Sequence, residues 1–411
     1  MKQTICYLIN SSICCLITTL GWAQPGQADL SKTNVGHVYD LEAPVVINSR
    51  VAMGENEAIV FLQAVNQTGS ELPPLQYEVR ADYQTETVLT TQSLTEDQLI
   101  KQEERVSYYR FPVSLQDNAN YVFIYLTVSI AGAELPLRYD ISLNTDRDFP
   151  LSHLLLMRAT EDIPIFENFI PQNELVRVVS ISEPDSAAYA YYYDHDFELN
   201  PPPMGSTGSE VQSNLTVDSL FQFPLNSPFS FDREGLYFAQ LDTTSLSGIS
   251  FRVENHYYPR LVSIADVAGP LRYISTAEEI EELRNGNEPK LAMDNYWMKM
   301  TRSQSRAKII IRDYFRQVTQ ANQLFTTYKE GWKTGMGMIY TLYGKPNDVY
   351  RDDDKEVWIY AADNNLVNMS FTFMKVRNIF TDQHYNLMRD EEYKRFWYRN
   401  IDLWRKGRKT L

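Results

Sequence analysis

The sequence has only three cysteines, and all of them lie within its first fifteen residues: Cys6, Cys14 and Cys15. Lys2 precedes an apolar stretch from Ile5 to Leu20, and Gly21-Trp22-Ala23 supplies a small-x-small cleavage site, the pattern of a secretory signal peptide. Cleavage there leaves a mature chain without thiols, which excludes a disulfide, a thiolate nucleophile and a thiolate metal site. We therefore expect residues 1–23 to be a signal peptide and the protein to be exported, to the periplasm or the outer envelope.

Long apolar runs are missing from the rest of the chain. After residue 23 no stretch approaches the ~20 apolar residues that a membrane-spanning helix needs, so we expect no transmembrane segment in the mature chain. The first apolar stretch has an alternative interpretation as an uncleaved membrane anchor. Asn10, Ser11 and Ser12 interrupt that stretch and favour the signal peptide.

Positive charge is scarce before residue 259 and concentrated after it. Residues 24–258 contain 33 Asp and Glu against 12 Lys and Arg, whereas residues 259–411 contain 20 against 25. The acidic part is interpreted most simply as a solvated surface that keeps an exported protein soluble. A second interpretation is that the basic part docks on an acidic partner, through seven cations near the end of the chain: Lys394, Arg395, Arg399, Arg405, Lys406, Arg408 and Lys409. Nucleic acid is a poor candidate partner, because export separates the protein from it and the chain is acidic overall.

Evenly spaced strands predict a β-sandwich from residue 36 to residue 148, after a linker at 24–35. The chain contains 27 Tyr and 19 Phe, and aromatic side chains suit a half-buried pleated surface. The predicted strands are Ala58–Val65, Gln76–Asp82, Arg105–Leu115, Tyr121–Ile130 and Leu135–Leu143. Their spacing, without intervening helices, favours a sandwich of about immunoglobulin size.

A second strand-rich unit is expected at residues 149–258, after a break at Asp146–Pro150. Its predicted strands are Leu154–Met157, Leu175–Ile181, Ala187–Tyr193, Gly235–Leu241 and Gly248–Val253. We interpret this unit as another sandwich. The chain is thus predicted to be multidomain and mainly β, beginning with two tandem Ig-like β-sandwich domains.

After Pro259 the apolar period changes from two to 3.6, which predicts an α+β domain over residues 259–411. Ser275 and Glu278 have the spacing of a capping box for a helix at 276–285, and Pro289 can open a second helix. A long helix is predicted by one apolar stripe: Ile310, Tyr314, Val318, Ala321 and Phe325.

A small antiparallel sheet should follow these helices. Its predicted strands are Met338–Tyr343, Val357–Tyr360 and Val367–Phe373, the last with apolar and polar residues in alternation. Four apolar residues place a final helix at the end of the chain, packed on this sheet: Tyr393, Trp397, Ile401 and Trp404.

One set of spaced residues in this last unit resembles a known family. Gly331-Trp332-Lys333-Thr334-Gly335 precedes Tyr340, Gly344 and Pro346, with Trp358 and Tyr360 further on. In this order the residues resemble the bacterial GWxTD domain family over residues 259–411. Gly335 departs from the family pattern, because it stands where the family has its eponymous Asp, and Met336 and Met338 stand where Arg is common. The resemblance implies an exported protein and names a domain, without implying a reaction.

Two interpretations of this motif stay open. Gly331 and Gly344 permit turn geometries that other residues avoid, and the aromatic rings supply large buried area around the sheet. Alternatively the rings line a ligand-binding cleft, with Lys333 and Thr334 as its polar groups. The candidate binding or motif residues are Gly331, Trp332, Lys333, Thr334, Tyr340, Gly344, Pro346, Trp358 and Tyr360.

Catalytic and metal-binding motifs are missing from the sequence. Its five histidines form no zinc-ligand spacing, and we expect no metal site and no cofactor. Asp194-His195-Asp196 is interpreted as a solvated loop or strand end, since neighbours on a strand face opposite sides. Asp352-Asp353-Asp354 lacks the central Gly and distal Glu of a calcium loop and is interpreted as a charged hairpin tip. No catalytic residue is assigned, and enzymatic activity stays undecided, with a non-enzymatic role favoured.

The predicted function is that of an exported cell-envelope interaction or scaffold protein. It would bind an envelope protein partner through its β-sandwich surfaces and its basic C-terminal domain. The alternative is a carbohydrate- or peptidoglycan-directed binder or hydrolase with its glycan site near Gly331-Trp332. A hydrolase needs two placed carboxylates, and 53 acidic residues make accidental pairs unavoidable, so the sequence decides neither way. The partner's identity and the oligomeric state stay open.

Overall fold

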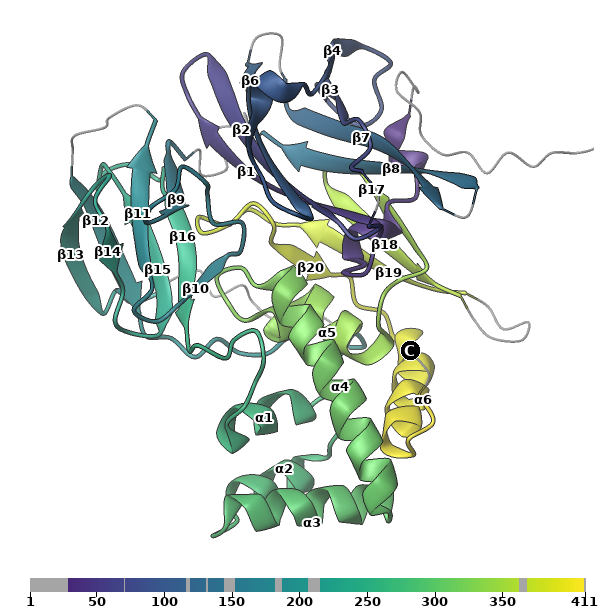
Figure 1. Cartoon of the computed structure of the whole chain (residues 1–411). Coiled ribbons are helices and arrows are strands. Elements are labelled where there is room, and N and C mark those ends of the chain that lie inside the picture. The colour runs from purple at the N-terminus through teal and green to yellow at the C-terminus, as the bar shows by residue number, and fades with distance from the viewer. Residues whose placement is uncertain are drawn as a thin grey trace, which may run out of the picture.

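The structure is a computed structural model that describes residues 29–69, 71–115, 119–130, 132–143, 152–181, 187–205, 215–361 and 368–409. The expected signal peptide with its three cysteines and the expected break at Asp146–Pro150 lie outside the described residues. Within them the fold is mainly β, with the helices gathered in the C-terminal part (Figure 1).

The first sandwich consists of two four-stranded antiparallel sheets. Their strand orders are β1-β2-β6-β5 and β4-β3-β7-β8. The strands are β1 (Val45–Met53), β2 (Glu57–Asn66), β3 (Gln76–Arg80), β4 (Val88–Ser93), β5 (Leu99–Gln102), β6 (Val106–Ser114), β7 (Tyr121–Ile130) and β8 (Ala133–Ser142). Alternate residues of facing strands form its core, among them Val60, Leu62, Phe111, Val122 and Ile124.

The second sandwich pairs a five-stranded sheet with a three-stranded one. The strand orders are β10-β16-β15-β12-β13 and β14-β11-β9, antiparallel except for β10 beside β16. The strands are β9 (Leu154–Arg158), β10 (Phe169–Pro171), β11 (Leu175–Ser180), β12 (Ala187–Tyr193), β13 (Ser219–Pro224), β14 (Phe229–Ser230), β15 (Gly235–Gln240) and β16 (Ile249–Glu254). Aromatic rings fill its core, with Phe231 in contact with Phe223, Tyr237 and Phe251. Both tandem sandwiches expected from the sequence are therefore present.

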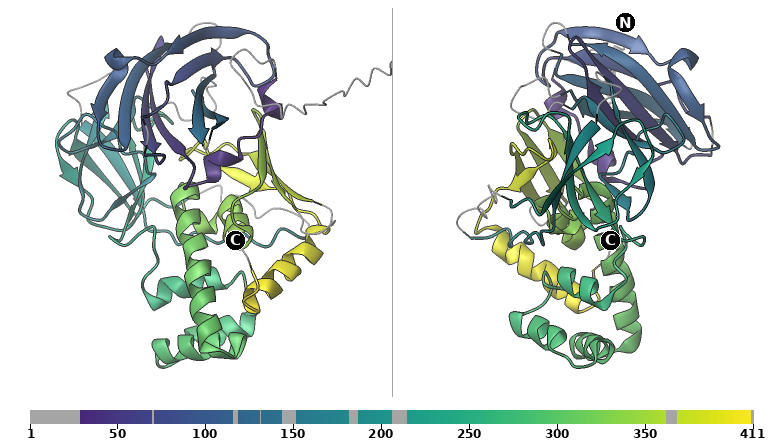
Figure 2. Two further views of the ribbon diagram at one scale, coloured as in Figure 1. Left: turned by 45° about the vertical axis from the view of Figure 1, so that its right-hand side comes forward. Right: turned by 90° about the vertical axis from the view of Figure 1, so that its left-hand side faces the viewer.

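The C-terminal part combines six helices with a four-stranded antiparallel sheet of order β17-β18-β19-β20. The helices are α1 (Ile264–Leu271), α2 (Ala277–Arg284), α3 (Pro289–Thr301), α4 (Gln304–Phe325), α5 (Gly335–Tyr343) and α6 (Tyr393–Arg405). The strands are β17 (Asp348–Arg351), β18 (Lys355–Tyr360), β19 (Met369–Lys375) and β20 (Tyr385–Leu387). Figures 1 and 2 show that α2, α3 and the first half of α4 project away from the three β-rich parts. In the part of the chain that the structure describes, no helix is both long and apolar enough to span a bilayer.

Two sequence predictions in this region were wrong in detail. Residues 338–343, predicted as a strand, form most of helix α5, whose N-cap Thr334 accepts a hydrogen bond from the Gly337 N–H. This run is apolar on all sides because the whole helix is buried, so its sequence carries no helical stripe. The capping box is also displaced by one residue, from Ser275 and Glu278 to Thr276 and Glu279, since the neighbouring hydroxyl and carboxylate offer the same spacing.

Most other elements follow the sequence prediction. The long helix places its apolar stripe inward, with Ile310, Tyr314 and Val318 buried. Asp352–Asp354 join β17 to β18 as the tip of a hairpin, as expected. Asp194–Asp196 directly follow β12, outside any strand, as expected.

The N-terminal end of the described chain packs into the C-terminal domain rather than extending as a linker. Val35 and Tyr39 belong to the core of that domain, and the Val35 N–H donates to the Val349 carbonyl at 2.8 Å. The Tyr39 ring lies 4.8 Å from the Trp358 ring, centroid to centroid. Leu30, inside the expected linker at 24–35, is fully buried against the first sandwich.

Smaller apolar clusters join the three units. Phe61 and Tyr108 of the first sandwich pack with Leu155 and Phe166 of the second. Phe238 of the second sandwich packs with Tyr328, which lies just ahead of the Gly331 motif. The units keep separate cores and contact one another through these interfaces.

Candidate functional site

The Gly331 turn lies directly against the C-terminal end of α4. A Cβ at Gly331 would stand 2.1 Å from the Ala321 carbonyl oxygen, so only glycine allows this approach. The Gly331 N–H donates to Thr326 Oγ1 at 3.1 Å, and the Trp332 N–H donates to Asn322 Oδ1 at 3.0 Å. Backbone donors of the motif are thus satisfied by polar side chains of the α4 end, which fixes the turn.

Thr334 and Gly337 continue the turn into helix α5. Thr334 Oγ1 donates to the Gly331 carbonyl at 2.8 Å and accepts from the Gly337 N–H at 2.9 Å. A Cβ at Gly337 would lie 1.8 Å from the Gly331 carbonyl oxygen. The glycine and threonine spacing of the motif is therefore a requirement of this tight helix start.

Gly335, the departure from the family pattern, faces a loop of the second sandwich. A Cβ at Gly335 would stand 2.5 Å from Asn200 Nδ2, and the Asn200 N–H donates to the Lys333 carbonyl at 3.1 Å. The Asn200 side chain would therefore have to move to admit an aspartate at this position. Met336 and Met338, which replace the family's common Arg, are buried in the core.

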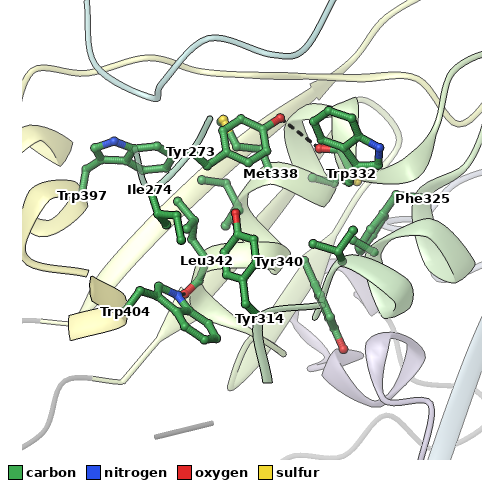
Figure 3. Close-up of a cluster of buried hydrophobic side chains, with 14 of the residues drawn as sticks. Tyr273, Ile274, Tyr314, Phe325, Trp332, Met338, Tyr340, Leu342, Trp397 and Trp404 are labelled. Atoms are coloured by element: carbon green, nitrogen blue, oxygen red, sulfur yellow. Dashed lines mark hydrogen bonds between the residues drawn. The ribbon is translucent and has the colours of Figure 1, made fainter. Parts of the chain in front are cut away.

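The aromatic residues of the motif lie inside the domain. Trp332 is 5% exposed, and Tyr340, Trp358 and Tyr360 are buried with it in one core. Figure 3 shows Trp332 beside Tyr273, whose hydroxyl donates to the Trp332 carbonyl at 3.0 Å. These rings are buried in the domain core and stabilise it. Gly344 ends α5 with a φ of 81°, and Pro346 is buried in the turn that follows.

Lys333 connects the motif to the second sandwich through a chain of charges. Its Nζ lies 2.6 Å from Asp196 Oδ1 and 3.0 Å from Glu330 Oε1. The Lys333 hydrogen bond lowers the pKa of Asp196. Burial raises the pKa of Glu330, but Arg252, 3.6 Å away on β16, and Lys333 lower it by more. The motif thus contributes one buried cation to the interface between the two units.

A buried lysine and a buried histidine lie next to this network. Burial lowers the pKa of Lys329 to about 8. Burial, and then the nearby charge of Lys329, lowers the pKa of His384 to about 4, so its imidazole is neutral at pH 7. His384 Nε2 has no hydrogen-bond partner among the described residues. Sequence reasoning missed both groups, because a single Lys and a single His carry no spacing signal.

A cleft of about 440 Å³ opens where the three units meet, and we call it the junction cleft. Thr334 and Met336 of the motif form part of its lining. The other walls come from all three units: residues 48–51 and 140–143 of the first sandwich, 166–168 of the second, and 323–325 and 382–385 of the C-terminal domain. No local sequence pattern could have predicted it, because its lining is drawn from segments more than 300 residues apart.

The seven C-terminal cations do not form one surface. Arg405 holds Glu279 with both nitrogens, at 2.8 and 2.7 Å, and donates to the Ile274 carbonyl, so it belongs to the fold. Lys406 pairs with Asp402, and Lys409 lies over the Tyr343 ring. Arg408 is exposed beyond the end of α6. Lys394, Arg395 and Arg399 share the first half of α6 with Tyr398, which is 58% exposed, and we call these four residues the α6 face.

The remaining candidates do not form a metal centre. Lys333 holds Asp196, and His195 packs against Phe197 with ring centroids 4.7 Å apart. Across the described ranges, no group of three or more His, Cys, Asp or Glu side chains could hold a metal ion.

A comparison with known protein families matches the part of the chain that contains the Gly331 motif. Residues 235–406 match the GWxTD domain, so the C-terminal part of this chain is a GWxTD domain. The match starts in β15, inside the second sandwich and ahead of residue 259. The Lys333 network described above joins this part of the sandwich to the motif. A search of curated proteins found no match to the chain.

Proposed function

We propose that this protein is an exported cell-envelope interaction protein that docks an acidic partner protein on the α6 face of its GWxTD domain. The observation that carries the proposal is the combination of an exposed tyrosine with unpaired arginines on one helix face. Arginine and tyrosine are the side chains most enriched where protein interfaces gain their binding energy.

Among the described residues, the two arginines of the α6 face, Arg395 and Arg399, form no ion pair with a carboxylate. Lys394 has only Glu391, at 3.9 Å. Tyr398 stands between the two arginines along the helix and is exposed. The opposite side of the same helix is fixed, since Trp397 and Trp404 are buried in the domain core. The face is therefore held in place with its charges available.

The positions of these cations disfavour a purely structural role. Lys394 and Arg395 occupy the first turn of α6, where the helix dipole places partial positive charge. Basic residues there cost up to about 1 kcal/mol relative to acidic ones. An acidic partner would offset this cost, since its carboxylates would meet the cations and the helix N-terminus together.

The sandwiches offer a second contact region for the same or another envelope protein. Leu220 is exposed on β13, which lies at the edge of the five-stranded sheet. An exposed edge strand can pair with an extended segment of another chain. We propose this surface as the auxiliary contact of the scaffold.

Charge reversal on the α6 face tests the proposal. Full-length protein, produced at native abundance, is crosslinked in intact cells and recovered by pulldown in three forms: wild type, R395E/R399E and the matched control K290E/K308E. Lys290 and Lys308 are exposed on α3 and α4, so the control changes the net charge equally at another surface.

A partner that is recovered with wild type and control but lost with R395E/R399E supports the proposal. The partner's own contact peptides, mapped by mass spectrometry, should be rich in Asp and Glu. A protein recovered alone in all three forms, or a partner retained equally by R395E/R399E, would refute docking on this face.

A further inference from the structure

The junction cleft has fixed walls. Arg50 of β1 donates to the Ile165 carbonyl at 3.0 Å and to Asn168 Oδ1 at 2.8 Å, across the two sandwiches. Asn168 Nδ2 in turn donates to the Thr326 carbonyl at 2.8 Å, across to the end of α4. At the other end, Arg351 of β17 lies 2.6 Å from Asp140 of β8. A ligand would therefore meet a preformed site and would not have to order it.

The lining mixes hydrogen-bond donors, acceptors and flat rings. Glu167, Gln323 and Gln383 are exposed at the cleft and reach it from three segments. Tyr121 and Tyr385 contribute partly exposed aromatic rings to the same lining. Arg351, whose side chain is 16% exposed, is already compensated by Asp140 and Glu356.

We propose that the junction cleft binds a neutral saccharide of one or two rings. A sugar hydroxyl both donates and accepts, so it suits a lining that contains carboxylates, amides and guanidinium groups. The C–H faces of a sugar ring suit the flat faces of tyrosines. An anion would meet Glu167, Asp353 and Asp382 in the same lining, and an apolar ligand would strip water from these groups without replacing their hydrogen bonds.

The size and place of the cleft fit such a ligand. Its volume of about 440 Å³ falls within the usual range for small-molecule pockets, roughly 300 to 1,000 Å³, which occur preferentially where domains meet. Thr334 and Met336 bring the GWxTD motif to the cleft wall, while Trp332 stays in the core. The motif would act on the ligand only by positioning this wall.

Two residues that line the cleft carry buried polar atoms without a hydrogen-bond partner among the described residues. These atoms are Thr327 Oγ1 and His384 Nε2. Buried polar atoms of native proteins are generally paired with protein, water or ligand. These two side chains therefore leave unused hydrogen-bonding capacity in the wall of the cleft.

Isothermal titration of the mature full-length protein tests this site. The probes are neutral saccharides (N-acetylglucosamine, chitobiose, maltose and cellobiose), with spermidine as a cationic probe and inorganic phosphate as an anionic one. The cleft variant E167Q/Q323A/Q383A neutralises one exposed carboxylate and truncates two exposed amide side chains at the cleft. The matched control E281Q/Q222A/Q304A makes the same changes at exposed positions on α2, β13 and α4.

We expect at least one neutral saccharide to bind with one-to-one stoichiometry. The cleft variant should weaken this binding at least tenfold, and the control should leave it unchanged. The docking variant R395E/R399E should also leave it unchanged, so this inference and the proposed function can fail separately. Binding of spermidine or phosphate alone, equal binding by the cleft variant, or no saccharide binding at millimolar concentration would each overturn the inference.

Discussion

The contact between Trp332 and Gly269 gives the sharpest test of how the motif stabilises its domain. Trp332 is buried, and a Cβ added at Gly269 of α1 would lie 3.0 Å from two carbons of its ring. The perturbation is a double-mutant cycle of W332A, G269A and the combined variant. W332A should cost ~3 to 5 kcal/mol, the usual range for removing a buried tryptophan.

G269A acts through two effects that the cycle separates. The added methyl group crowds the indole ring, which costs about 1 to 3 kcal/mol. G269A also changes the backbone contribution to the free energy of unfolding, because Gly269 lies in a helix and precedes Pro270. This contribution changes by the same amount in wild type and in the W332A background. The crowding disappears once the ring is gone. G269A should therefore cost about 1 to 3 kcal/mol less in the W332A background than in wild type.

Chemical denaturation followed by the helical circular dichroism signal measures these differences, because nearly all helices lie in the C-terminal domain. Y398A is the control, since its exposed ring should change stability by less than about 0.5 kcal/mol. Additive costs of W332A and G269A, within about 0.5 kcal/mol, would refute the packing of this ring on α1.

Three further predictions concern buried contacts. R351A leaves Asp140 and Glu356 without their buried cation, so it should cost about 3 to 5 kcal/mol of stability in a thermal or denaturant melt. R312A is the control: it breaks an exposed pair with Asp313 and should cost less than about 1 kcal/mol. G337A should yield misfolded or insoluble C-terminal domain on expression, since its Cβ would overlap the Gly331 carbonyl; soluble protein with wild-type melting would contradict the tight turn. Burial lowers the pKa of His384 from 6.5 to about 4, so the unfolded chain binds a proton that the folded chain does not, and stability should fall as pH drops from about 6.5 towards 4. H384F should reduce this slope without abolishing it, because burial lowers the pKa of His37 to about 4 as well, and an unchanged slope would contradict the assignment.

The sequence predicted the central strands of the sheets better than the strands at their edges. The continuously apolar strand β7 and the alternating strand β19 were placed within a few residues. The missed strands all lie at the edges of their sheets: β1, β4, β5, β10, β13, β14, β17 and β20. In β4 and β5 no residue is buried, and β1 is buried only near its ends, so polar side chains hide the period of two. Helix α5 was missed for the opposite reason, since burial on every side removes the helical stripe.

The GWxTD motif could be found from sequence, but the places of its residues could not. Periodicity predicts which face of an element is buried, and it does not say that Val35 and Tyr39 join a core some 300 residues away. The same limit applies to Asn200, whose approach to Gly335 depends on how the second sandwich sits on the domain. Arg405 shows the limit for charge, because a terminal basic cluster predicts a solvated surface while this side chain is held by Glu279.

Site-specific photocrosslinking from position 398 shows whether a partner protein docks on the α6 face. A photoreactive phenylalanine analogue replaces Tyr398 in the full-length protein, and another copy carries it at Ile309, which is also exposed but lies on α4. In intact cells we expect one dominant adduct from position 398, lost when R395E/R399E is added, and no such adduct from position 309. The absence of an adduct at 398, or the same adduct from both positions, would contradict docking on the α6 face.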